Sequence, residues 1–173
     1  MIISSCFLQR KIKALATSQK GRKIFYPSWE KAASVLVAYL YKDKVTIEPC
    51  IARLKSMDKK VMQLVFVDNV KEDVPQESQS VFIKREKLNV WGIPDKELLQ
   101  AASALKADML IDLSSACCLP LIYAELLNPS LLKVGPKWGE GMTFYDFTID
   151  VPRAEGAFVL LEQVIVYARR FGK

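Results

Sequence analysis

The sequence predicts one α/β domain in which helices cover both faces of a mostly parallel sheet. Short apolar runs rich in β-branched and aromatic residues alternate with amphipathic stretches along the chain, which is the pattern of βαβ units. The chain has 173 residues, a typical length for one domain. Hydrophobic residues make up 51% of it, enough to cover both faces of a buried sheet.

An amphipathic helix is predicted near the N-terminus, from residue 5 to about residue 20. Its apolar stripe has the i, i+4, i+7 spacing of one helix face and consists of Leu8, Ile12 and Leu15. Gly21 predicts the end of this helix, and the stretch after it, which holds Pro27, is expected to be a loop. We therefore divide the chain into a basic N-terminal helix and loop, residues 1–30, and a single α/β domain, residues 31–173.

The first βα unit begins with a continuous apolar run at residues 34–41, typical of a strand covered on both faces. Thr46 is predicted to cap the following helix, and Pro49 to lie in its first turn. Residues 61–67 form the second predicted strand. The polar stretch 68–79 is long for a loop in a compact domain.

The remaining elements continue the alternation. Four more strands are predicted, at residues 81–83, 109–113, 131–134 and 144–151. Helices are predicted after Pro94-Asp95, from Pro120 to Leu127, and from about residue 154 to residue 170. The whole is a Rossmann-like three-layer sandwich with a basic N-terminal helix. Its sheet core is expected to contain Val35, Val37, Leu64, Phe66, Leu110, Leu113 and Val134.

The formal charge of +6 is confined to one segment. Residues 1–31 hold seven basic residues and one acid, whereas the rest of the chain holds 18 basic and 18 acidic residues. The predicted basic surface consists of Arg10, Lys11, Lys13, Lys20, Arg22 and Lys23. We expect residues 1–31 to contact an anionic surface: a membrane, a nucleic acid or an acidic protein. The apolar stripe of the same helix can meanwhile pack on the body.

The absence of histidine excludes Ser-His-Asp and Cys-His catalysis and histidine metal sites. No pair of the four cysteines has CxxC spacing, so we expect no metal site, no disulfide framework and no cofactor. Cys117 and Cys118 are predicted to be small buried residues at a helix start. Reduced thiols favour a cytoplasmic location. The longest uncharged run, residues 113–124, has 12 residues, fewer than the ~20 that cross a membrane.

No catalytic residue is predicted from these patterns, but candidate ligand-binding residues follow the strands, where open α/β sheets bind ligands. These candidates are Asp43, Ser114, Ser115 and Lys137. A simple role in turns or caps is the alternative for the two serines. The glycine-rich stretch 135–141 matches neither GxGxxG nor GxxxxGK[ST] and is interpreted as a connecting turn.

Five segments occur in a characteristic order along the chain: KAASVLV at 31–37, NVWG at 89–92, ADMLIDLS at 107–114, LKVG at 132–135 and YDFTID at 145–150. Together they resemble an uncharacterised family of small Bacteroidota proteins, a domain of unknown function. The resemblance covers nearly the whole chain. It implies no activity.

The segment 108–135 also resembles the N-terminal half of heptosyltransferase-like glycosyltransferases, in which a D-x-x-I-D-L strand precedes a helix and a strand ending K/R-x-G. Those enzymes carry an Asp six residues before a Pro, as Asp43 precedes Pro49 here, so the resemblance implies a catalytic role for Asp43 alone. Lys42 replaces the glycine expected before it. Such enzymes need a second Rossmann-like half, for which this chain has no room, so the resemblance supports the fold and argues against transferase activity.

Two functions follow from these observations. The preferred one is a non-catalytic cytoplasmic binding or partner-interaction protein that uses its basic N-terminal helix. The alternative is a small enzyme acting on a phosphorylated or glycosyl substrate at the carboxyl ends of the strands. A cleft with convergent polar groups at those ends would favour the enzyme, whereas a flat face with an exposed basic helix would favour the binder.

Overall fold

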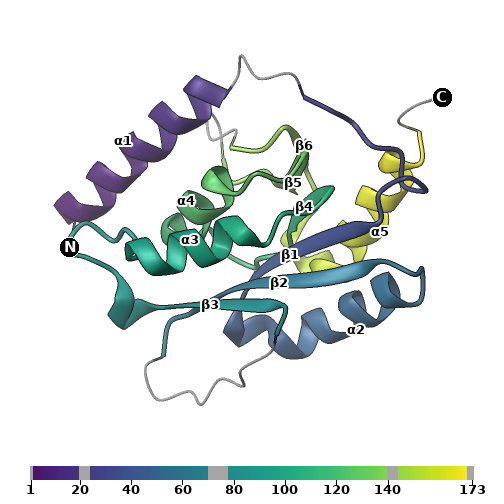
Figure 1. Cartoon of the computed structure of the whole chain (residues 1–173), viewed down its shortest axis with the longest axis horizontal. Helices are drawn as coiled ribbons and strands as arrows, with labels where there is room; N and C mark the ends of the chain where they lie inside the picture. The colour runs from purple at the N-terminus through teal and green to yellow at the C-terminus, as the bar shows by residue number, and fades with distance from the viewer. Residues whose placement is uncertain (1, 20–23, 70–77, 140–143, 171–173) are drawn as a thin grey trace.

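The computed structural model describes residues 2–19, 24–69, 78–139 and 144–170. Within them, six strands form one sheet in the order β3-β2-β1-β4-β5-β6 (Figure 1). The strands are β1 (Ser34–Leu40), β2 (Lys60–Val67), β3 (Ser80–Lys84), β4 (Met109–Asp112), β5 (Leu132–Pro136) and β6 (Phe147–Ile149). The helices are α1 (Ile2–Gln19), α2 (Lys44–Lys55), α3 (Lys96–Ala104), α4 (Leu119–Leu127) and α5 (Gly156–Ala168).

All five strand pairs are parallel, which confirms the predicted α/β fold. The centre of the sheet is β1, where Val37 pairs with Gln63 of β2 on one side and with Ile111 of β4 on the other. The strand order reverses between β1 and β4. Ligands of open α/β sheets bind at such a switch point, outside the carboxyl ends of the strands.

The sheet is buried on both faces, because alternate residues of a strand point to opposite sides. Val35 and Val37 of β1 pack with α2 and α5, whereas Leu36 and Ala38 pack with α3 and α4 (Figure 1). The predicted sheet core is confirmed, since each of its members is at most 8% exposed: Val35, Val37, Leu64, Phe66, Leu110, Leu113 and Val134. The result is a three-layer sandwich.

Helix α1 lies outside these three layers and packs on α4 (Figure 1). Leu8 and Ile12 are buried against Ile122 and Leu126 of α4. At the end of α1, the Gln19 side chain donates a hydrogen bond to the carbonyl oxygen of Leu126, at 2.6 Å. The predicted apolar stripe is therefore the docking face of the helix.

The start of the second helix differs from the prediction. Tyr41–Asp43 forms a 3-10 turn that continues directly into α2, so the N-cap is Asp43 and not Thr46. Thr46 lies inside the first turn, where its hydroxyl donates to the carbonyl oxygen of Asp43, at 2.7 Å. As a consequence Pro49 lies inside the helix, beyond its first turn.

Two further boundaries differ. The predicted strand at 144–151 is reduced to β6, because Phe144 and Tyr145 leave the sheet and pack with α1 and α4. The last helix begins at Gly156, after a 3-10 turn at Arg153–Glu155. Most of the polar stretch 68–79 and part of the glycine-rich stretch 135–141 lie outside the described residues.

Candidate functional site

Two loops meet at the switch point of the sheet, one after β1 and one after β4. The carboxylate of Asp43 accepts hydrogen bonds from the backbone N–H of Ser115, at 3.0 Å, and from its hydroxyl, at 2.9 Å. These residues are 72 positions apart in the sequence. The Asp43–Ser115 bridge therefore fastens the two halves of the sheet together where a crevice would otherwise open.

The structure brings the four candidate residues to one pocket of about 230 Å³, lined by Asp43, Ser114, Ser115 and Lys137 together with Thr46 and Trp138. The ammonium of Lys137 lies 3.5 Å from a carboxylate oxygen of Asp150. The Ser114 hydroxyl is buried and has no hydrogen-bond partner among the described residues. The pocket thus has a charged rim, and the buried Ser114 hydroxyl lies beside the carboxylate of Asp112.

A buried polar network lies next to this pocket. Asp112, at the end of β4, accepts hydrogen bonds from the backbone N–H of Ser114, at 2.8 Å, and from the phenol of Tyr145, at 2.5 Å. The Tyr145 oxygen in turn accepts from the indole N–H of Trp138, at 3.3 Å. Burial raises the pKa of Asp112, and the hydrogen bonds offset this only in part. No pattern in the sequence predicted this network.

Glu125 of α4 is a second buried acid, at 1% exposure. Neither of its carboxyl oxygens accepts a hydrogen bond from the described part of the chain. Burial raises the pKa of Glu125 well above its ordinary value, and the neighbouring charge of Asp112 raises it further. Both effects favour the neutral acid, whereas the nearby Tyr145 side chain and the Lys133 ammonium lower the pKa in part.

The cysteines are free thiols. Burial raises the pKa of Cys50 to about 11 and that of Cys118 to about 12, so neither is a ready thiolate nucleophile. Cys117 is exposed, contrary to the prediction of a buried pair, because it lies in the loop before α4 and faces a cavity. Among the described residues, no group of three or more acidic or cysteine side chains is arranged to hold a metal ion.

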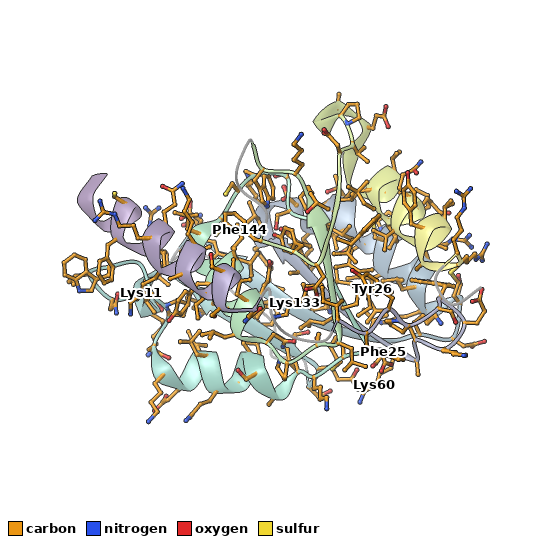
Figure 2. The ribbon with its side chains drawn as sticks, turned by 90° about the horizontal axis from the view of Figure 1, so that it is seen from above. Lys11, Phe25, Tyr26, Lys60, Lys133 and Phe144 are labelled. Carbon is orange, nitrogen blue, oxygen red and sulfur yellow. The ribbon has the colours of Figure 1, made fainter. Side chains whose placement is uncertain are left out.

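The basic side of α1 faces solvent. Arg10, Lys11 and Lys13 are exposed, while the stripe on the other side of the helix is buried. Figure 2 shows Lys11 on the side of the molecule that α1 occupies, well away from Lys60. The other predicted members of the basic surface, Lys20, Arg22 and Lys23, lie outside the described residues. No helix in the described ranges is long and apolar enough to cross a membrane.

A model of a protein family matches residues 5–167 of the chain. The chain belongs to the family of unknown function DUF6913. This confirms the resemblance to a domain of unknown function, and it assigns no activity to any residue. No curated protein matches the sequence.

The fold of this DUF6913 chain is similar to the crystal structure of the glycosyl transferase family 9 from Veillonella parvula, with a TM-score of 0.54 and 15% sequence identity. The similarity covers 82% of this chain but only 42% of the transferase chain. It confirms the resemblance to that class of enzyme at the level of the fold. At this identity nothing follows for activity.

Proposed function

We propose that this DUF6913 protein is a non-catalytic binding protein that contacts an anionic partner through the exposed side of α1. The observation that carries the proposal is the division of one helix into two faces. Leu8 and Ile12 are buried on α4, Arg10 and Lys13 lie on the opposite side of the helix, and Lys11 is exposed beside the buried stripe, over the ring of Phe7. A docked helix fixes the backbone from which these cations project, so less backbone freedom is lost when a partner binds.

The contact we propose is electrostatic. The apolar stripe of α1 is already covered by α4, so this helix has no free apolar face to insert into a bilayer. Each basic residue held at an anionic surface contributes about 1 kcal/mol. Three such residues give an attachment that weakens strongly with salt, since charges are screened over ~8 Å at physiological ionic strength.

The pocket at the switch point gives less support to catalysis than α1 gives to binding. Its acid, Asp43, is engaged by Ser115, and its base, Lys137, lies near Asp150. The first pair joins the loops after β1 and β4 and the second joins the ends of β5 and β6, so both connect neighbouring segments and neither leaves an acid or a base free for proton transfer. The four cysteines have no CxxC spacing and are few for a disulfide scaffold, which favours reduced thiols and a cytoplasmic location.

The test uses charge substitutions, because deleting α1 would expose the buried face of α4. A triple variant, R10Q/K11Q/K13Q, is compared with a matched control, K55Q/K60Q/K96Q, whose lysines are exposed on the body. Binding to anionic vesicles, a nucleic-acid duplex and polyglutamate is measured at low and at moderate salt. We expect the first variant to lose binding to one of these partners and the control to retain it.

On a duplex, the slope of log affinity against log salt should fall by about 0.9 for each phosphate contact that is lost. Equal loss in the two triple variants would mean that overall charge, and not α1, drives binding. Failure of the wild-type protein to bind any of the three partners would also refute the proposal.

A second candidate is the small enzyme, which one observation favours: polar side chains from different strand ends, Asp43, Ser114, Ser115 and Lys137, converge on the 230 Å³ pocket. We propose a phosphorylated or glycosyl substrate of monosaccharide size for this site. Phosphate or sugar release from a panel of sugar phosphates and aryl glycosides tests it. Turnover that disappears in Ser114→Ala and Lys137→Met, with unchanged melting temperature, would establish the enzyme. The absence of turnover across the panel would leave the binding protein.

A further inference from the structure

A cavity of about 590 Å³ opens on the other side of the two switch-point loops. Tyr41 and Lys42 line it, whereas the next residue, Asp43, lines the smaller pocket. Its walls come from the ends of β1, β2 and β3 and from the start of α4. The volume lies within the ~300–1,000 Å³ of typical small-molecule sites. None of the candidate residues from the sequence faces this cavity.

The inner walls of the cavity are apolar and aromatic. Phe66 and Leu40 come from the sheet and Leu8 from α1, and all three are at most 8% exposed. Trp91 lines the cavity and is 43% exposed. Its ring lies against that of Phe7, with 4.6 Å between centroids, so α1 holds the indole in place. Such walls suit a flat apolar group.

Within the described ranges, two of the three charged groups that line the cavity are cations. Lys42 is exposed on the loop after β1, and Arg85 follows β3. Arg85 donates to Asp68 at 2.7 Å, which uses one of the five N–H donors of the guanidinium. Asp68, which is also the one acid among the described residues that line the cavity, thereby orients Arg85 and is itself neutralised. The lining therefore carries a net positive charge.

The start of α4 adds to this potential. Cys118 is the N-cap and makes no side-chain capping hydrogen bond, and the first turn contains no acidic residue. Both Cys118 and Leu119 line the cavity. The N-terminal end of a helix carries a partial positive charge, which favours an anion nearby.

We propose that this cavity binds an organic anion with a flat apolar body. The body lies against Phe66 and Trp91, and the anionic group lies between Lys42 and Arg85. An inorganic anion leaves the apolar walls in contact with water, and a neutral aromatic molecule makes no ion pair with Lys42 or with the remaining N–H donors of Arg85. The two features together therefore define the ligand class. This site is separate from the exposed side of α1, and neither proposal depends on the other.

The experiment uses 8-anilinonaphthalene-1-sulfonate, which has a flat aromatic body and one sulfonate, and N-phenyl-1-naphthylamine, its neutral counterpart. The fluorescence of each probe is titrated against the full chain. Lys42→Met should weaken binding of the sulfonate about three- to tenfold, as expected for one charge-assisted contact, and leave the neutral probe unchanged. Arg85→Met should act in the same direction, with a further effect from the carboxylate of Asp68 left without its partner.

A blocking variant tests the location. Cys117→Trp places an indole at an exposed position in the cavity wall and should weaken both probes at least tenfold. Val45→Trp is the control, because Val45 is 79% exposed and lines none of the three cavities described. Thermal unfolding of every variant checks that it is folded.

Unchanged binding in folded Cys117→Trp would overturn the site. Equal effects of Lys42→Met on the sulfonate and on the neutral probe would overturn the anionic ligand class. Competition then distinguishes two sources of the same chemistry, with adenosine 5′-monophosphate representing nucleotides and indole-3-acetate representing aromatic carboxylic acids. We expect one of them to displace the sulfonate probe, and displacement by neither would refute the assignment.

Discussion

Replacing Glu125 by methionine is expected to stabilise the protein at neutral pH. Glu125 is buried in α4, and neither of its carboxyl oxygens accepts a well-formed hydrogen bond from the described residues, so its neighbours Tyr145 and Lys133 offset the loss of water only in part. A buried polar group left unsatisfied costs about 1–3 kcal/mol. Methionine has a similar volume and carries no such group. We expect Glu125→Met to gain roughly this amount below pH 4.5, where the carboxyl group is protonated in both states, and more at pH 7.

The pH dependence of this gain follows from the direction of the pKa shift. The pKa of Glu125 is raised above its ordinary value of 4.5 by burial, so above pH 4.5 the folded protein keeps a proton that the unfolded chain releases. The favourable contribution is fully present below pH 4.5 and is lost as the pH rises toward the raised pKa. Within that window the wild-type protein loses up to about 1.4 kcal/mol per pH unit through this group.

Urea unfolding of wild type and variant at pH 5, 6 and 7 measures both effects. The difference in unfolding free energy should widen in favour of Glu125→Met as the pH rises, because all other titrating groups are shared. Glu48→Met, an exposed substitution on α2, is the control and should show no such trend. A difference that stays constant with pH, or a variant less stable than wild type at every pH, would show that Glu125 is ionised and partnered.

Three further predictions concern the fold. Leu110→Ala should lower the free energy of unfolding in urea by about 2–5 kcal/mol, because Leu110 is fully buried in β4. Val90→Ala, at an 83% exposed position, is the control and should change it little. A loss below ~0.5 kcal/mol for Leu110→Ala would show that Leu110 does not lie in the core. Gly135→Ala should destabilise the protein by about 1–3 kcal/mol, since a Cβ at this position collides with the ring of Tyr145, and an unchanged midpoint would show that the ring is free to move. A chelator and a reductant should each leave the melting temperature unchanged, and a clear drop with either would reveal a metal or a disulfide.

The elements could be predicted because their signals are local. Continuous apolar runs marked β1, β2 and β4, and Asp95 proved to be the N-cap of α3, accepting a hydrogen bond from the backbone N–H of Leu98 at 2.9 Å. The prediction that Thr46 is the N-cap was wrong, because a 3-10 turn leads into the helix and moves its N-cap to Asp43. No residue type in the sequence indicates such a turn. The strand at 144–151 was too long because its aromatic residues face a helix, which periodicity alone does not reveal.

From the sequence, the candidate site could be predicted only as a group of residues that follow strands. Parallel strands bring their carboxyl ends to one edge, so Asp43, Ser115 and Lys137 were expected there as a class. Their contacts were not predictable, since the Asp43–Ser115 bridge depends on β1 and β4 being neighbours. The bond between Tyr145 and Asp112 requires an irregular segment to fold back over β4, and the sequence carries no signal for it.

The two loops joined by the Asp43–Ser115 bridge line both cavities and separate them. Tyr41 and Lys42 face the larger cavity and Asp43 the smaller, and the loop after β4 is divided in the same way, with Ser115 on one side and Cys117 on the other. A ligand that displaces these loops when it binds in one cavity also changes the volume of the other cavity. Thermodynamic linkage then requires that two ligands bound in the two cavities change each other's affinity by the same factor.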